Sequence, residues 1–186
     1  MNFSEFKKSE ARKIMLYLDE LIDVINGKEK DYNTLNWLRH LQGLRSFISD
    51  LKLGTELRDE EMAKNLIWLK EANPDRKIIC WGATSHFLYN SSEVRLLKKI
   101  KSVEKHYQET KMMGNYIKEK YQGKVFTVGF TAYEGEYGTK GYGVNKKVKE
   151  PGENTLEYLL GQSSFDNYLL PFGEYKISSL ASRPLG

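Results

Sequence analysis

The chain has 186 residues, of which 12% are aromatic and 29% are charged, and its formal net charge is +4. That length suits one domain with an apolar core, and the aromatic content excludes a disordered tail. No apolar run approaches the roughly 20 residues of a membrane span, and residues 1–13 are too polar for a signal peptide. We therefore expect a cytoplasmic protein that does not bind membranes. Removal of a signal peptide from a longer precursor stays an open alternative.

The charge pattern and the motif content exclude further classes. A local lysine cluster consists of Lys98, Lys99, Lys101 and Lys105. Glu104 and Glu109 dilute it, so we interpret it as a solvated helix face and expect no nucleic-acid partner. The sequence contains no Gly-x-Ser-x-Gly, Gly-x-Gly-x-x-Gly or P-loop motif. Its 3 histidines and 1 cysteine are too widely spaced for a zinc pattern, so we expect no metal and no cofactor.

Helical periodicity dominates the N-terminal third. Apolar residues recur at helical spacing between residues 14 and 25, and Asn26-Gly27 supplies a stop. A second stripe runs over residues 37–51 and ends at Gly54. The short connection predicts an antiparallel hairpin over residues 1–54. A third helix is expected from an N-cap at Thr55 to just before Pro74.

Residues 55–186 are then predicted to form an α/β portion of the same single domain, residues 1–186. Short apolar runs at 77–81 and 125–130 read as buried strands on either side of a crossover helix at 108–121. A helix at 155–160 and a strand at 168–170 repeat the unit, and residues 176–180 could add an edge strand. The order predicts a mostly parallel sheet covered by helices. Residues 131–150 read as a long loop or hairpin with its turn at 141–143.

Ligands of such a sheet bind beyond the C-terminal ends of its strands. The first strand leads into Thr84, Ser85 and His86, and the second leads into Tyr133 and Glu134. If the strands are neighbours, His86 and Glu134 face one cleft. A lone histidine is more often a surface or capping residue, and Glu134 also fits a turn carboxylate. We expect Cys80, Trp81 and Trp68 to be core residues.

The segment 58–86 carries the most informative motif. Its helix reads Arg-Asp-x-x-Met-Ala-x-Asn-x-x-Trp-Leu, a strand ends at Trp81, and a polar loop runs to His86. This succession resembles the erythromycin esterase-like proteins, some labelled succinoglycan-biosynthesis proteins, in which the loop reads His-Asn-x-His. Ala83 stands at the first histidine of that loop, Thr84 at the asparagine and His86 at the second histidine. Met113-Gly114, residues 125–135 and residues 152–170 continue the resemblance, which covers the C-terminal part of the family's length.

The resemblance implies a bacterial hydrolase of carboxylic esters or lactones, of the kind linked to macrolide antibiotic resistance. It implies His86 and Glu134 as catalytic residues. Substrate-binding residues would be Thr84, Ser85, Arg58, Asp59 and Tyr133. Arg58 and Asp59 would orient the substrate or the histidine, although both also fit the ordinary charges of a first helical turn.

Two differences from the family pattern bear on activity. The family's general base lies in a Gly-Glu-x-x-His segment that residues 1–186 do not contain, and Ala83 replaces a loop histidine. We therefore expect no hydrolysis above background by this chain without that N-terminal segment. The alternative is a non-catalytic domain whose cleft binds a small polar or saccharide ligand. The expected partners are a small-molecule ester, lactone or saccharide, and either the N-terminal half of the same protein or a second copy of the chain.

Overall fold

The computed structural model describes residues 7–94, 101–138, 146–165 and 167–170. The chain divides into two compact units. The first unit comprises residues 1–82 and 86–126, and the second comprises residues 83–85 and 127–186. Of the described residues, 59% are helical and 3% are in strands. No helix in these described ranges is long and apolar enough to cross a membrane.

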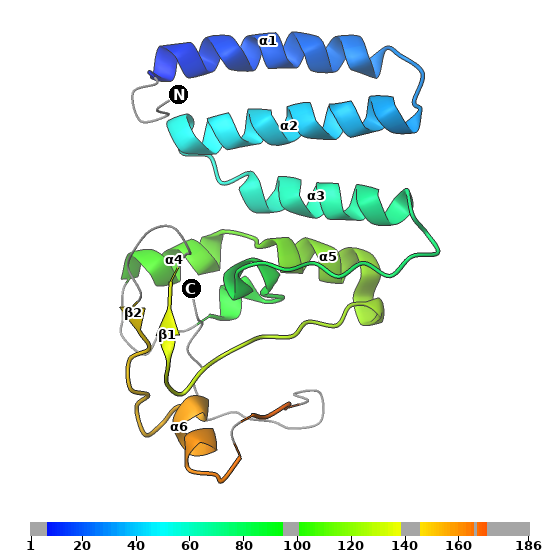
Figure 1. Ribbon diagram of the computed structural model, residues 1–186. Helices are drawn as coiled ribbons and strands as arrows, with labels where there is room; N and C mark the ends of the chain where they lie inside the picture. The colour runs from blue at the N-terminus through cyan, green and yellow to red at the C-terminus, as the bar shows by residue number, and fades with distance from the viewer. Residues whose placement is uncertain (1–6, 95–100, 139–145, 166, 171–186) are drawn as a thin grey trace. The chain divides into compact units, whose positions relative to one another are not determined.

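Three long helices open the first unit. They are α1 (Lys8–Asn26), α2 (Tyr32–Leu53) and α3 (Arg58–Glu71). Figure 1 shows α1 and α2 as an antiparallel pair. Their apolar stripes meet in a cluster of Ala11, Leu18 and Ile48. The predicted stop at Gly54 is confirmed, because this glycine has φ +70°, a left-handed conformation that costs glycine little.

The beginning of α3 differs from the prediction of a Thr55 N-cap. The N-cap is Leu57, and the carboxylate of Asp50 accepts hydrogen bonds from the backbone N–H groups of Leu57 and Arg58, at 2.9 and 2.7 Å. Thr55 donates its hydroxyl to the same carboxylate. A side chain near the end of α2 therefore satisfies the first N–H groups of α3, and it connects the two helices.

The remainder of the first unit is built from short helices. These are η3 (Ser91–Glu93), α4 (Lys101–Glu109), α5 (Met113–Tyr121) and η4 (Gln122–Lys124), preceded by η2 (Thr84–Phe87), which begins in the second unit. The single helix expected at 108–121 is therefore wrong, since α4 ends at Glu109 and α5 starts afresh at Met113. A second cluster, of Ala63, Met113 and Ile117, packs α3 against α5. Lys98 and Lys99 of the expected lysine cluster lie outside the described residues.

The predicted α/β fold with a mostly parallel sheet is wrong. Residues 77–81, 125–130 and 168–170 form no strand, and residues 176–180 lie outside the described chain. Ile79 and Trp81 are 93% and 81% exposed, and Cys80 is also exposed, so the expected burial of this run is wrong as well. The physical reason is that a short apolar run indicates strand propensity, whereas a strand exists only where a neighbour supplies backbone partners.

The described part of the second unit contains one small sheet and one helix. Strands β1 (Glu136–Tyr137) and β2 (Lys146–Lys147) pair antiparallel, with Glu136 opposite Lys147. This pairing agrees with a hairpin within 131–150, although the expected turn at 141–143 lies outside the described residues. Helix α6 (Leu156–Gly161) confirms the helix expected at 155–160. Its N-cap, Thr155, accepts a hydrogen bond from the backbone N–H of Tyr158.

Candidate functional site

Asp59 occupies the centre of the candidate site. It lies in the first turn of α3 and is only 8% exposed. Its Oδ1 accepts a hydrogen bond from the backbone N–H of Met113, the first residue of α5, at 2.9 Å. A carboxylate at this place satisfies a free N–H group and complements the positive end of the α5 dipole. Asp59 is thereby held in one orientation between two helices.

The same carboxylate holds His86. Nδ1 of the imidazole lies 2.9 Å from Oδ1 and 3.1 Å from Oδ2 of Asp59, and the histidine side chain is 23% exposed. A carboxylate can only accept, so Nδ1 carries the proton in this contact. In a neutral imidazole the other ring nitrogen, Nε2, then has a free lone pair and can accept a proton. In this pair His86 can act as a base, and Asp59 is the group that orients it.

Gly114 explains how the loop carrying His86 approaches α5 so closely. A Cβ atom at this position would lie 2.4 Å from the carbonyl oxygen of Phe87 and 2.6 Å from that of Leu88. Only a residue without a side chain fits there. Asn115 adds a hydrogen bond of 2.6 Å from its side-chain amide to the carbonyl of Tyr89. The Met-Gly pair at the start of α5 thus fixes the backbone that follows His86.

The remaining predicted site residues have different surroundings. Arg58 is exposed, and its backbone N–H is bound by Asp50, so Asp59 is the member of the Arg-Asp pair that contacts His86. In the second unit Thr84, Ser85 and Tyr133 are half-buried, Glu134 is exposed, and the Tyr133 ring lies against Gly161. Because Glu134 and His86 belong to different units, their sharing of one cleft stays a prediction.

The structure also shows polar clusters that sequence reasoning missed. Glu56 accepts a hydrogen bond from the Thr110 hydroxyl, and its Oε1 lies 3.2 Å from Nδ1 of His106. The Thr110 hydrogen bond lowers the pKa of the Glu56 carboxyl below its usual value. In the second unit the buried carboxylate of Glu157 accepts from the Thr131 hydroxyl. These contacts join residues far apart in the sequence, so no local pattern could have indicated them.

The described residues contain no group of three or more His, Cys, Asp or Glu side chains that could hold a metal ion. A histidine with a fixed tautomer can take a proton from water or donate a hydrogen bond to a polar ligand.

The comparisons with known proteins agree with the resemblance seen in the sequence. The family model described as erythromycin esterase matches residues 28–185, a span that includes α2, α3, the His86 loop, α5 and α6. The chain matches no curated protein and no solved structure. Because the family match covers well over half of the sequence, this chain belongs to the erythromycin esterase family.

Proposed function

We propose that this chain acts in the hydrolysis of a carboxylic ester or lactone, with His86 taking a proton from the attacking water. The observation that supports this most directly is the contact of His86 Nδ1 with the buried carboxylate of Asp59 at 2.9 Å. Membership of the erythromycin esterase family supports a hydrolase-like domain. The arrangement matches the requirement of general-base catalysis for a histidine of defined tautomer and orientation.

In the proposed reaction Nε2 of His86 accepts a proton from water while the water oxygen bonds to the ester carbonyl carbon. The imidazolium formed is stabilised by the Asp59 carboxylate, and it returns the proton to the leaving alcohol as the tetrahedral intermediate collapses. The hydroxyls of Thr84 and Ser85, immediately before His86 in the chain, are proposed to bind the substrate. Tyr133 and Arg58 are proposed as further substrate-binding residues, and Glu134 is proposed as a second catalytic residue.

We expect residues 1–186 by themselves to hydrolyse no ester or lactone above background. The resemblance implies that the family's principal base lies in a Gly-Glu-x-x-His segment, and residues 1–186 do not contain this segment. A positioned general base contributes about 10² to 10⁴-fold to a rate. His86 with Asp59 is proposed to supply the second part of the machinery, so activity should rise when that segment of a family member is fused ahead of residue 1.

The test measures hydrolysis of an aryl ester and of a macrolide lactone by the chain and by the fusion. We expect His86→Ala and Asp59→Asn to lower kcat of the fusion, by about 10²-fold or more for the histidine. The matched control is His40→Ala, since His40 is exposed on α2, away from Asp59. A fusion whose turnover is the same with His86→Ala would overturn the proposed role of His86.

A second candidate function is ligand binding without catalysis, and Ala83 favours it. The methyl group of alanine cannot transfer a proton at a position where the family has a histidine. In that case Asp59 and His86 would orient a small polar or saccharide ligand. A fusion that binds a macrolide or saccharide but hydrolyses no ester above background would support this second candidate.

A further inference from the structure

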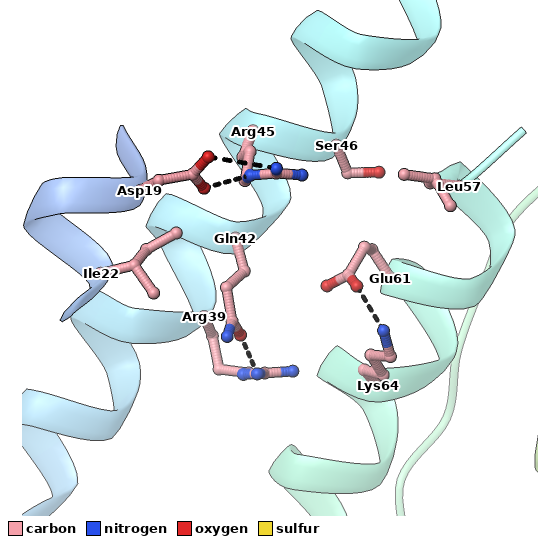
Figure 2. A pocket seen from close by; sticks show the side chains of 9 residues that line it. All are labelled: Asp19, Ile22, Arg39, Gln42, Arg45, Ser46, Leu57, Glu61 and Lys64. Atoms are coloured by element: carbon pink, nitrogen blue, oxygen red, sulfur yellow. Dashed lines mark hydrogen bonds and ion pairs between the residues drawn. The ribbon is translucent and has the colours of Figure 1, made fainter. Parts of the chain in front are cut away.

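A cavity lies among the first three helices of the first unit. Its volume is about 340 Å³, near the lower end of small-molecule pockets. Figure 2 shows its lining, which comes from α1, α2 and α3. Asp59 and Glu61 are two residues apart on α3, a spacing that places side chains on different faces of a helix. The cavity is therefore separate from the face of α3 that holds His86, and nothing assigned to the family site accounts for it.

The charged groups around the cavity differ in how they are neutralised. Arg45 forms an ion pair with Asp19, and Lys64 lies 2.7 Å from carboxylate oxygens of Glu60 and Glu61. Arg39 instead donates to the neutral side-chain amide of Gln42. Figure 2 shows the Arg39 guanidinium extending from α2 toward α3. Among the lining cations, Arg39 is thus the one available to an incoming anion.

Two buried polar atoms, one on α2 and one on α3, have no hydrogen-bond partner among the residues that the structure describes. They are Oγ of Ser46, a residue only 4% exposed, and Oε2 of Glu61. In Figure 2 both side chains are directed into the space between α2 and α3. Folded proteins rarely leave such atoms unsatisfied, because burial removes the hydrogen bonds that water would make. A ligand hydroxyl would satisfy both, by donating to the carboxylate and accepting from the serine.

We propose that this cavity binds a small hydroxylated carboxylic acid, of the size and chemistry of a sugar acid. Its carboxylate pairs with Arg39, and one of its hydroxyls bridges Ser46 and Glu61. A bidentate guanidinium–carboxylate pair is among the stronger polar contacts available. A multiply charged phosphate fits less well, because Asp19 and Glu61 line the same small space. A neutral sugar would leave Arg39 without its anion.

Calorimetric titration of the full chain with glucuronate, glucose and acetate tests the proposal. Glucose lacks the carboxylate and acetate lacks the hydroxyls, so each carries half of the recognised chemistry. We expect saturable binding of glucuronate. Glucose and acetate should each bind at least about tenfold more weakly than glucuronate. Arg39→Gln and Ser46→Ala should each weaken glucuronate binding by a similar factor.

The matched controls are Arg12→Gln and Ser9→Ala, at exposed positions on α1 outside the cavity, which should bind as the unchanged chain does. If Arg39→Gln fails to fold, judged by circular dichroism, Ser46→Ala still decides, because alanine is well tolerated in a helix. Glucose binding as tightly as glucuronate, or glucuronate binding that survives in Ser46→Ala, would overturn the proposal. Absence of saturable glucuronate binding would overturn the proposal too.

Discussion

The two units of the molecule bury their apolar residues in different ways. In the first unit, residues spaced along α1, α2, α3 and α5 meet in two clusters. In the second, α6 buries Leu156 beside the polar Thr155 and Glu157, while Phe130, Phe165 and Leu169 are more than half exposed. An amphipathic helix needs only another helix to cover its stripe, whereas short extended runs need a sheet. The extended run 77–81 of the first unit behaves in the same way, because Ile79 and Trp81 are exposed there. The comparison therefore separates helices, which a local pattern specifies, from extended runs, which depend on distant partners.

Glycine substitutions sharpen this comparison most strongly. Gly114 faces backbone atoms of Phe87 and Leu88 at 2.4–2.6 Å, and backbone cannot move aside cheaply. We expect Gly114→Ala to destabilise the first unit by about 2 kcal/mol, since overpacking typically costs about 1–3 kcal/mol. Thermal unfolding followed by circular dichroism measures the change. In the second unit the same substitution at Gly161 meets the side chain of Tyr133, which can rotate, so a smaller loss is expected there.

The control for Gly114 is a glycine in a helix with room for a methyl group. A Cβ at Gly43 of α2 would meet its nearest neighbour, Asn65, at 3.8 Å. Gly43→Ala should therefore stabilise the chain by about 0.5–1 kcal/mol, through helix propensity. If the melting temperature falls equally in both variants, the close approach of the His86 loop to α5 is not the reason that alanine at position 114 destabilises the chain.

Helices in the first unit were predictable because their signals are local. The apolar stripes of α1 and α2, Gly27 and Gly54 all stand in the sequence next to the structure they specify. The cap of α3 was not predictable from the local sequence, because the Asp50 side chain that binds it belongs to the preceding helix. The strands at 77–81 and 125–130 were wrongly predicted, since pairing depends on other parts of the chain that no short window contains.

The site shows the same division. The motif placed Asp59 and His86 among the candidates, and the possibility that Asp59 orients a histidine came from the resemblance. The hydrogen bond from Met113 to Asp59 joins residues 54 positions apart, so it could be seen only in the folded chain. The cavity among α1, α2 and α3 is a similar case, because its wall combines side chains whose separate patterns indicate only surface charge and ordinary helix faces.

Helix caps offer a second, smaller test of the difference between the units. Thr155 caps α6, a helix of 6 residues, and Asp31 caps α2, a helix of 22 residues. Replacing Thr155 with alanine should cost about 1 kcal/mol, and replacing Asp31 should also weaken the start of its helix. A helix as short as α6 has little stability of its own, whereas α2 has a core to hold it. We expect Thr155→Ala to expose the amides of all of α6 to hydrogen exchange, and Asp31→Ala to expose only the first turn of α2. If the two variants lose hydrogen-exchange protection over the same extent of α6 and of α2, the expected difference between the two helices is wrong.

The smallest expected effect concerns pH, because the two caps differ in kind. The backbone N–H of Thr34 donates to Asp31 at 2.6 Å, and this hydrogen bond is the main reason that the pKa of Asp31 lies below its usual 3.8. A lowered carboxyl pKa means that the folded state favours the charged form. The cap therefore stabilises α2 above about pH 3.8 and is lost as the pH falls through the lower folded-state value. The Thr155 hydroxyl of α6 has no charge to lose in this range.

NMR titration of the Asp31 carboxyl and the Thr34 amide should give a shared midpoint below 3.8, and Asp31→Asn should abolish that transition at Thr34. A Thr34 amide that titrates unchanged in Asp31→Asn would show that another carboxylate governs the start of α2.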